Sequence, residues 1–167
     1  PAGPATTALY YVTLKMARGQ EGQLIPAFFH SFKQNLKQAT ALWVGYLAVG
    51  ILLVLDLVIC LQTSSVFAGA MFFTSVVLLV CWALFITMLF PLVARCDNTI
   101  GALFKMGIAM ALRNVMPVLA ALMVTVAFFA VGVFVFWPVL LVAPGLASYC
   151  NAFLFNRIFD KYGMTLE

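Results

Sequence analysis

Long apolar runs alternate with short polar segments along this chain. Residues 39–61, 66–94 and 115–136 together contain one charged side chain, that of Asp56. An α-helix needs about 20 apolar residues to cross a hydrocarbon core about 30 Å thick, and each run is that long. The pattern predicts an all-α fold, a polytopic bundle of transmembrane helices in a single domain covering residues 1–167.

The C-terminal third of the chain allows two interpretations. Trp137-Pro138 and Pro144-Gly145 both interrupt its apolar pattern. Either a tight turn starts a fourth span over residues 138–155, or the third span is long and the remainder lies flat on the membrane. We favour the fourth span, because Arg157 and Lys161 then return to the side of the other basic residues.

Two further segments are amphipathic and basic. From Pro26 onward, apolar side chains recur at helical spacing and form one stripe, and this helix is predicted to continue without a break into the span at 39–61. Residues 100–114 form the second such segment. Helices of this kind lie at the cytoplasmic interface of a membrane or dock onto a partner. The residues that would do this in the first segment are Phe28, Phe29, Phe32, Lys33, Lys37 and Trp43.

The order of segments hints at an internal repeat. Each half contains a basic amphipathic helix, a span that crosses the membrane and a span that returns, as in many transporters. Chance would produce the same order, so both interpretations stay open.

Asn35, Asn114 and Asn156 lie beside the ends of spans. Inside a bundle these amides would hydrogen-bond between helices, and at the interface they would contact water; we favour the second interpretation.

The basic residues give the chain an orientation. Nine Lys and Arg stand against five Asp and Glu, and only 8% of residues are charged. If the four spans are correct, all nine fall on one side, which the positive-inside rule makes cytoplasmic. Nine scattered cations are too few for a nucleic-acid surface. The lipid bilayer is therefore the expected partner.

Candidate chemistry is sparse. Asp56 is the only acid within a span and is a candidate site, because an ionised carboxylate in hydrocarbon is costly. It also lies near a span end, where water or Thr63, Ser64 and Ser65 are within reach. A single histidine, His30, and four separate cysteines give no metal-ligand spacing. We expect no enzyme active site, cofactor or metal.

Three stretches together resemble a known family. They are residues 4–15 (PATTALYYVTLK), 29–40 (FHSFKQNLKQAT) and 156–162 (NRIFDKY). They are similar to the YesL family of small bacterial membrane proteins. In that family a further transmembrane helix precedes the first stretch, so the resemblance implies a helix upstream of Pro1. It also implies a plasma-membrane location and a setting in carbohydrate import, because members are often encoded beside sugar ABC transporters.

Composition and resemblance together lead to one functional hypothesis and two alternatives. The chain is expected to be a non-enzymatic accessory subunit or assembly partner of a carbohydrate ABC importer, in contact with its permease subunits. A self-standing channel or small transporter, built from an oligomer of the chain or from its two halves, is the first alternative. A membrane-embedded sensor or scaffold is the second.

Overall fold

A computed structural model describes residues 2–20, 22–63, 66–96, 99–134 and 138–164. Within these ranges every regular element is an α-helix, which confirms the predicted all-α fold. The helices are α1 (Ala2–Met16), α2 (Leu24–Gln34), α3 (Leu36–Gln62), α4 (Val66–Arg95), α5 (Ile100–Arg113), α6 (Val115–Phe134) and α7 (Val139–Lys161).

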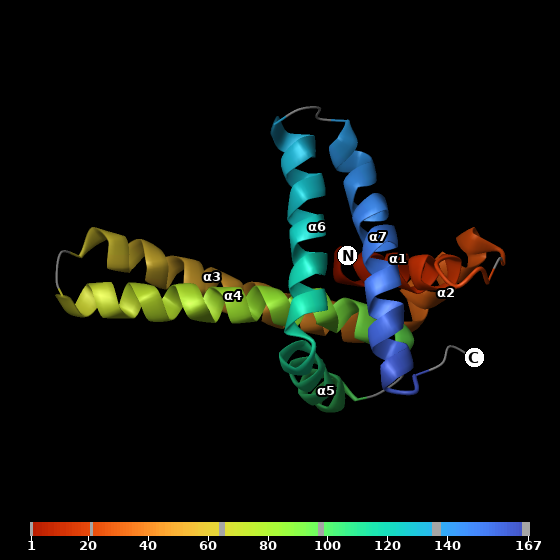
Figure 1. The fold of residues 1–167 in the computed structure, drawn as a ribbon, viewed down its shortest axis with the longest axis horizontal. Coiled ribbons are helices and arrows are strands. Elements are labelled where there is room, and N and C mark those ends of the chain that lie inside the picture. Colours follow the sequence, from red (N-terminus) through yellow and green to blue (C-terminus); the bar gives the residue numbers. More distant parts are fainter. Residues whose placement is uncertain (1, 21, 64–65, 97–98, 135–137, 165–167) are drawn as a thin grey trace.

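The helices form an L (Figure 1). One arm is the long hairpin of α3 and α4, and the other is the hairpin of α6 and α7. The shorter helices α1, α2 and α5 lie around the junction of the arms. The sequence places the four apolar segments in a single bundle, whereas in this structure the two hairpins extend in different directions from a common base.

Three of the helices are long and apolar enough to cross a membrane: Leu36–Gln62, Phe67–Arg95 and Val115–Phe134. Little of their apolar surface is covered by protein. In the most apolar stretch of Leu36–Gln62, only 11% of residues are buried. Exposed apolar surface on this scale requires an apolar solvent, and lipid supplies it.

The fourth expected span corresponds to α7, which returns beside α6 (Figure 1). The helix continues through Pro144, as a span over residues 138–155 requires. Proline is tolerated in apolar helices where neighbouring groups satisfy the freed backbone. That residues 138–155 cross the bilayer stays a prediction.

The core lies at the base of the L, where the C-terminal ends of α1, α4 and α7 meet. Leu14, Leu92 and Phe159 are fully buried there, one from each helix. Tyr10 packs edge-on against Phe155, with ring centroids 5.8 Å apart. The best-packed part of the described structure therefore joins three segments that are far apart in sequence.

Two asparagines separate helices that follow one another directly, and Asn35 does so within a helix that the sequence predicts to be continuous. Asn35 separates α2 from α3, and Asn114 separates α5 from α6. The side-chain nitrogen of Asn35 donates to the carbonyl oxygen of Ser31 at 3.1 Å, and that of Asn114 donates to Met110 at 3.0 Å. Such local bonds compete with regular helix geometry. Both amides are buried, so the expectation that they contact water was wrong.

The packing order of the helices repeats along the chain. Helix α1 packs against α2 and α3, and α4 packs against α5 and α6 in the same way. In each set an asparagine joins the amphipathic helix to the apolar helix that follows. This order is a repeat of three helices that starts at α1 and at α4, one helix earlier than the unit that the sequence indicated.

Candidate functional site

The base of the L holds a cluster of polar side chains around Arg95, at the end of α4. The Arg95 side chain is only 1% exposed. Its Nη1 donates to the Oδ1 atom of Asn156 at 2.9 Å, and its Nη2 donates to the carbonyl oxygen of Met164. The guanidinium also lies over the ring of Phe159, 4.8 Å from the centroid. An arginine buried this deeply is a structural centre rather than a surface charge.

Asn156 connects this arginine to α1. Its Oδ1 atom also accepts from the Nε atom of Arg18 at 3.0 Å, and its Nδ2 atom donates to the carbonyl oxygen of Leu14 at 3.1 Å. One buried amide of α7 therefore joins the ends of α1 and α4. Asn156 is 7% exposed, so the expectation that it contacts water was wrong as well.

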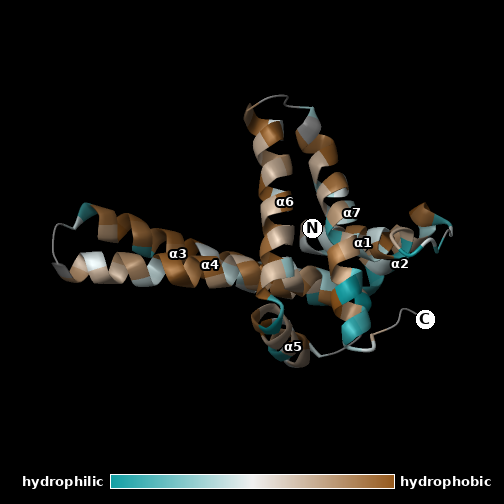
Figure 2. Cartoon of the chain, viewed as in Figure 1, coloured by the Kyte–Doolittle hydropathy of each residue, from teal (hydrophilic) through white to brown (hydrophobic). Residues whose placement is uncertain are grey.

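Asp160 supplies the negative charge of the cluster. Its carboxylate pairs with Arg18 and lies 3.9 Å from Nη2 of Arg95. The Asp160 side chain is 58% exposed, so these ion pairs are partly screened by solvent. Figure 2 shows hydrophilic residues gathered on this end of α7, while the arms are mostly apolar. The arginine cluster, defined as Arg18, Arg95, Asn156 and Asp160, thus lies at one end of the apolar body.

In the sequence, Arg18 and Arg95 were only two of the nine basic residues that indicate orientation, and Asp160 was an acid near the last of them. Their contacts join α1, α4 and α7. Arg18 and Asn156, which form one of these contacts, are 138 residues apart in the sequence. Nothing local in the sequence reports such a pairing. The one signal available was the position of an arginine at the end of an apolar span, where its stem is buried and its donors need acceptors.

Asp56, the predicted intramembrane site, is half-buried in α3 and accepts a hydrogen bond from the hydroxyl of Ser75 in α4. The sequence pointed instead to Thr63, Ser64 and Ser65 as donors. The Thr63 hydroxyl donates to Ile59 within its own helix at 3.0 Å, and the two serines lie outside the described residues. The contact therefore joins the two helices of the long arm.

The second arm has a polar contact of the same kind, which the sequence analysis missed. The Nδ2 atom of Asn151 in α7 donates to the Thr125 hydroxyl in α6 at 2.9 Å, and Asn151 is fully buried. Burial raises the pKa of the neighbouring Tyr10, and a hydrogen bond with Asn151 opposes the rise. Tyr10 is therefore neutral at physiological pH. An asparagine inside an apolar run was the available signal.

Substitutions of Asp56 distinguish a structural role of its hydrogen bond with Ser75 from a role of its negative charge. We expect Asp56→Asn to keep the contact with Ser75 and the stability of the hairpin. Asp56→Leu removes the acceptor and is expected to cost about 0.6–1.7 kcal/mol, the range of interhelical hydrogen bonds in membranes. Unfolding in mild detergent measures both. Equal losses for the two variants would show instead that the negative charge is required.

The predicted docking helix is divided by the break at Asn35. Phe28, Phe29 and Phe32 stay together on α2, where Phe28 packs edge-on against Phe29 and stacks on Phe32. Phe29 is 57% exposed. Trp43 lies on α3, partly buried against the core near Gly3. It therefore does not extend the exposed stripe.

The charges of this segment remain at the surface. Lys33 in α2 and Lys37 in α3 are both exposed, beside an apolar surface that Ile25 extends with 72% exposure. We call Ile25, Phe29, Lys33 and Lys37 the α2 surface. It combines apolar and cationic groups, as membrane-interface and docking helices do.

The described ranges hold no group of three or more histidine, cysteine or acidic side chains placed to bind a metal ion. Among these described residues, Cys60, Cys81, Cys96 and Cys150 form no disulfide. The polar contacts of Asp56 and Asn151 belong to different arms, so these side chains do not line one shared path.

These features define an α-helical integral membrane protein with a polar cluster at one end of its apolar body. The family described as "Protein of unknown function, DUF624" matches residues 1–57, which contain α1, α2 and most of α3. No curated protein and no solved structure matches the chain. The chain is thus similar to that family over its first third, where the α2 surface lies.

Proposed function

We propose that this chain is a non-enzymatic membrane subunit that docks onto the permease of a carbohydrate ABC importer or assists its assembly. In this proposal it resides in the bacterial plasma membrane with the arginine cluster facing the cytoplasm. The resemblance of residues 4–15 and 29–40 to the YesL family supplies the importer. The match of residues 1–57 to a family described as a protein of unknown function is compatible with it.

The α2 surface is the observation that carries the docking role. Ile25 and Phe29 are one helical turn apart and both mostly exposed, at 72% and 57%. An apolar helix face with anchors four residues apart is typical of helices that dock into a partner's groove. Because α1 packs against α2, and α1 belongs to the best-packed part of the fold, this surface is held rigidly. A rigid surface binds with less loss of conformational entropy.

Co-purification of the full-length protein from its native membrane tests the proposal. We expect permease subunits to co-purify with the tagged protein in mild detergent. The double variant Ile25→Ser/Phe29→Ser is expected to lower their yield about tenfold or more, because each anchor is worth at least ~1 kcal/mol.

The chain provides a matched control on its other amphipathic helix. Ile100 and Phe104 of α5 are also exposed and four residues apart. We expect Ile100→Ser/Phe104→Ser to keep the permease yield. Thermal unfolding of both proteins shows that each remains folded. Equal yields from the two double variants, or the absence of permease subunits from the wild-type sample, would reject the docking role.

A further inference from the structure

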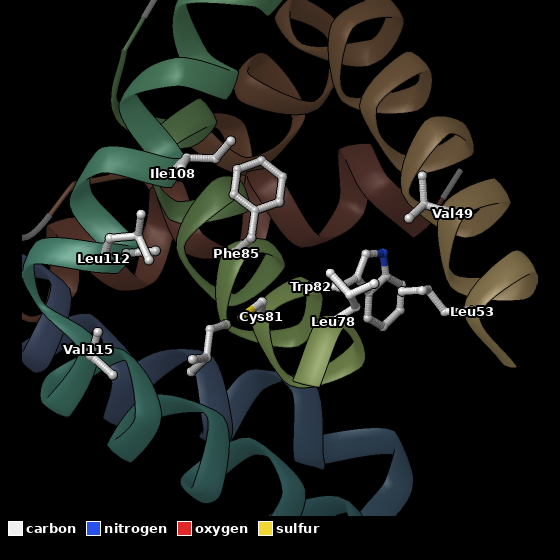
Figure 3. Close-up of a pocket in the computed structure, with 11 residues that line it drawn as sticks. Val49, Leu53, Leu78, Cys81, Trp82, Phe85, Ile108, Leu112 and Val115 are labelled. Atoms are coloured by element: carbon white, nitrogen blue, oxygen red, sulfur yellow. The ribbon is translucent and has the colours of Figure 1, made fainter. Parts of the chain in front are cut away.

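An apolar groove lies in the corner of the L, between α3, α4, α5 and α6 (Figure 3). Its volume is about 510 Å³, within the range of small-molecule sites. A smaller cavity of about 280 Å³ shares Val49, Trp82 and Phe85 with it. Both cavities are flanked by helices long and apolar enough to cross a membrane. The groove is therefore accessible from the hydrocarbon of the bilayer.

The walls of the groove select an apolar occupant. Leu53, Leu78, Ile108 and Val115 surround it with hydrocarbon, as Figure 3 shows, and Cys81 adds a thiol. A sugar or peptide would lose its hydrogen bonds with water here and regain almost none. A hydrocarbon chain makes no hydrogen bonds with water, so it loses none when it enters the groove.

One polar atom in the walls lacks a partner. The indole Nε1 of Trp82 is buried and has no hydrogen-bond acceptor among the described residues. The ring is held in place by Tyr46, which stacks on it with centroids 4.0 Å apart, and by Gly50, where a Cβ atom would come within 2.4 Å of it. A buried donor fixed in this way requires an acceptor. The ester carbonyl of a lipid provides one next to an acyl chain.

A cation lies on the helix that borders the groove. Lys105 is exposed on α5, three residues before Ile108 and seven before Leu112, which both line the groove. Residues at this spacing share one side of a helix. Lys105 therefore flanks the groove and selects a negatively charged headgroup.

We propose that the groove binds one acyl chain of an anionic phospholipid of the surrounding bilayer. Trp82 donates a hydrogen bond to the ester of this lipid, and Lys105 pairs with its phosphate. The site is independent of any importer and of the α2 surface.

Fluorescence quenching by brominated lipids tests this site in the reconstituted full-length protein. In a protein that carries Trp43→Phe and Trp137→Phe, Trp82 is the one tryptophan that remains in residues 1–167. A reference protein carries Trp82→Phe as well, together with Phe73→Trp, because Phe73 is 71% exposed on the outer part of α4. Any further tryptophan of the expressed protein is also changed to phenylalanine. Vesicles contain either brominated phosphatidylglycerol or brominated phosphatidylcholine at low mole fraction.

We expect brominated phosphatidylglycerol to compete for the Trp82 site about fivefold better than brominated phosphatidylcholine, the preference that ~1 kcal/mol from one lysine gives. The Phe73→Trp reference is expected to show no preference. Lys105→Gln, at an exposed position, is expected to abolish the preference at Trp82. Ile108→Phe, which fills the groove, is expected to reduce the quenching of Trp82 by both lipids.

Three results would overturn the proposal. Equal quenching of Trp82 by the two lipids removes the anionic selectivity. An unquenched Trp82 beside a quenched Phe73→Trp reference shows that protein, rather than lipid, occupies the groove. Unchanged selectivity in Lys105→Gln removes the lysine from the site.

Discussion

Arg95→Ala is expected to lower the stability of the protein more than substitution of any other charged residue at the base of the L. The variant loses the bonds to Asn156 and Met164, and each hydrogen bond to a charged group is worth about 1.5–3 kcal/mol. A net loss of about 3 kcal/mol corresponds to a fall in Tm of roughly 6–12 °C in a protein of this size. Unfolding in mild detergent measures it.

Two further variants make this expectation specific. Arg95→Lys keeps the charge but cannot reach two acceptors with a planar fork, so we expect an intermediate loss. Arg113→Ala removes an exposed arginine at the end of α5 and is expected to change Tm little. If Arg95→Ala and Arg113→Ala unfold at the same temperature, the arginine cluster does not hold the three helix ends together.

Gly3→Ala is expected to have the second-largest effect, through packing. A Cβ atom at Gly3 would lie 2.5 Å from the carbonyl oxygen of Ala39 and 2.7 Å from the Cβ of Trp43. Both atoms belong to or adjoin the backbone of α3 and cannot turn away, so α1 must move. Overpacking of this kind costs about 1–3 kcal/mol. The measurement is again unfolding in detergent.

Gly45→Ala provides the matched control within α3. No atom lies within 4 Å of a Cβ built at Gly45, so the substitution meets open space. Alanine in the interior of a helix is favoured over glycine by roughly 0.5–1 kcal/mol. We therefore expect Gly45→Ala to be neutral or stabilising. A loss of stability in Gly45→Ala equal to that in Gly3→Ala would show that helix propensity, rather than the contact of α1 with α3, is being measured.

The helices themselves were predictable from the sequence because their signals are local. The apolar run at 66–94 matches α4, Val66–Arg95, and the amphipathic segment at 100–114 matches α5, Ile100–Arg113. The continuous helix expected from Pro26 to Leu61 was wrong, because the side chain of Asn35 bonds back to Ser31. One side-chain amide causes this break, and the spacing of apolar residues contains no sign of it.

The candidate site was less predictable because its contacts are long-range. Arg95 meets Asn156 across 61 residues and Asp56 meets Ser75 across 19. The sequence identified Asp56 correctly as an acid within an apolar run but not the helix that supplies its donor. Arg95 and Asn156 looked like ordinary residues at span ends, because burial at the base of the L depends on how three helices converge.

The direction of the arms is the feature that most affects how the chain sits in a membrane. Helix α3 has 27 residues and is about 40 Å long, longer than a hydrocarbon core of about 30 Å, so it crosses a bilayer even when strongly tilted. Helix α6, with 20 residues, is about 30 Å long and crosses only when nearly upright. Because α6 has almost no length to spare for a tilt, both hairpins cross one bilayer from a common base only if the two arms come closer to parallel than the L in Figure 1.

Labelling of single cysteines in intact cells tests this arrangement most directly. In a full-length protein without its native cysteines, Thr63→Cys and Pro138→Cys mark the tips of the two arms, and Gly19→Cys and Gly163→Cys mark the base. We predict that an impermeant maleimide labels both tips from outside and labels the base only after the cells are opened. Labelling of either tip only after the cells are opened would contradict the account, because that arm would then not cross the membrane.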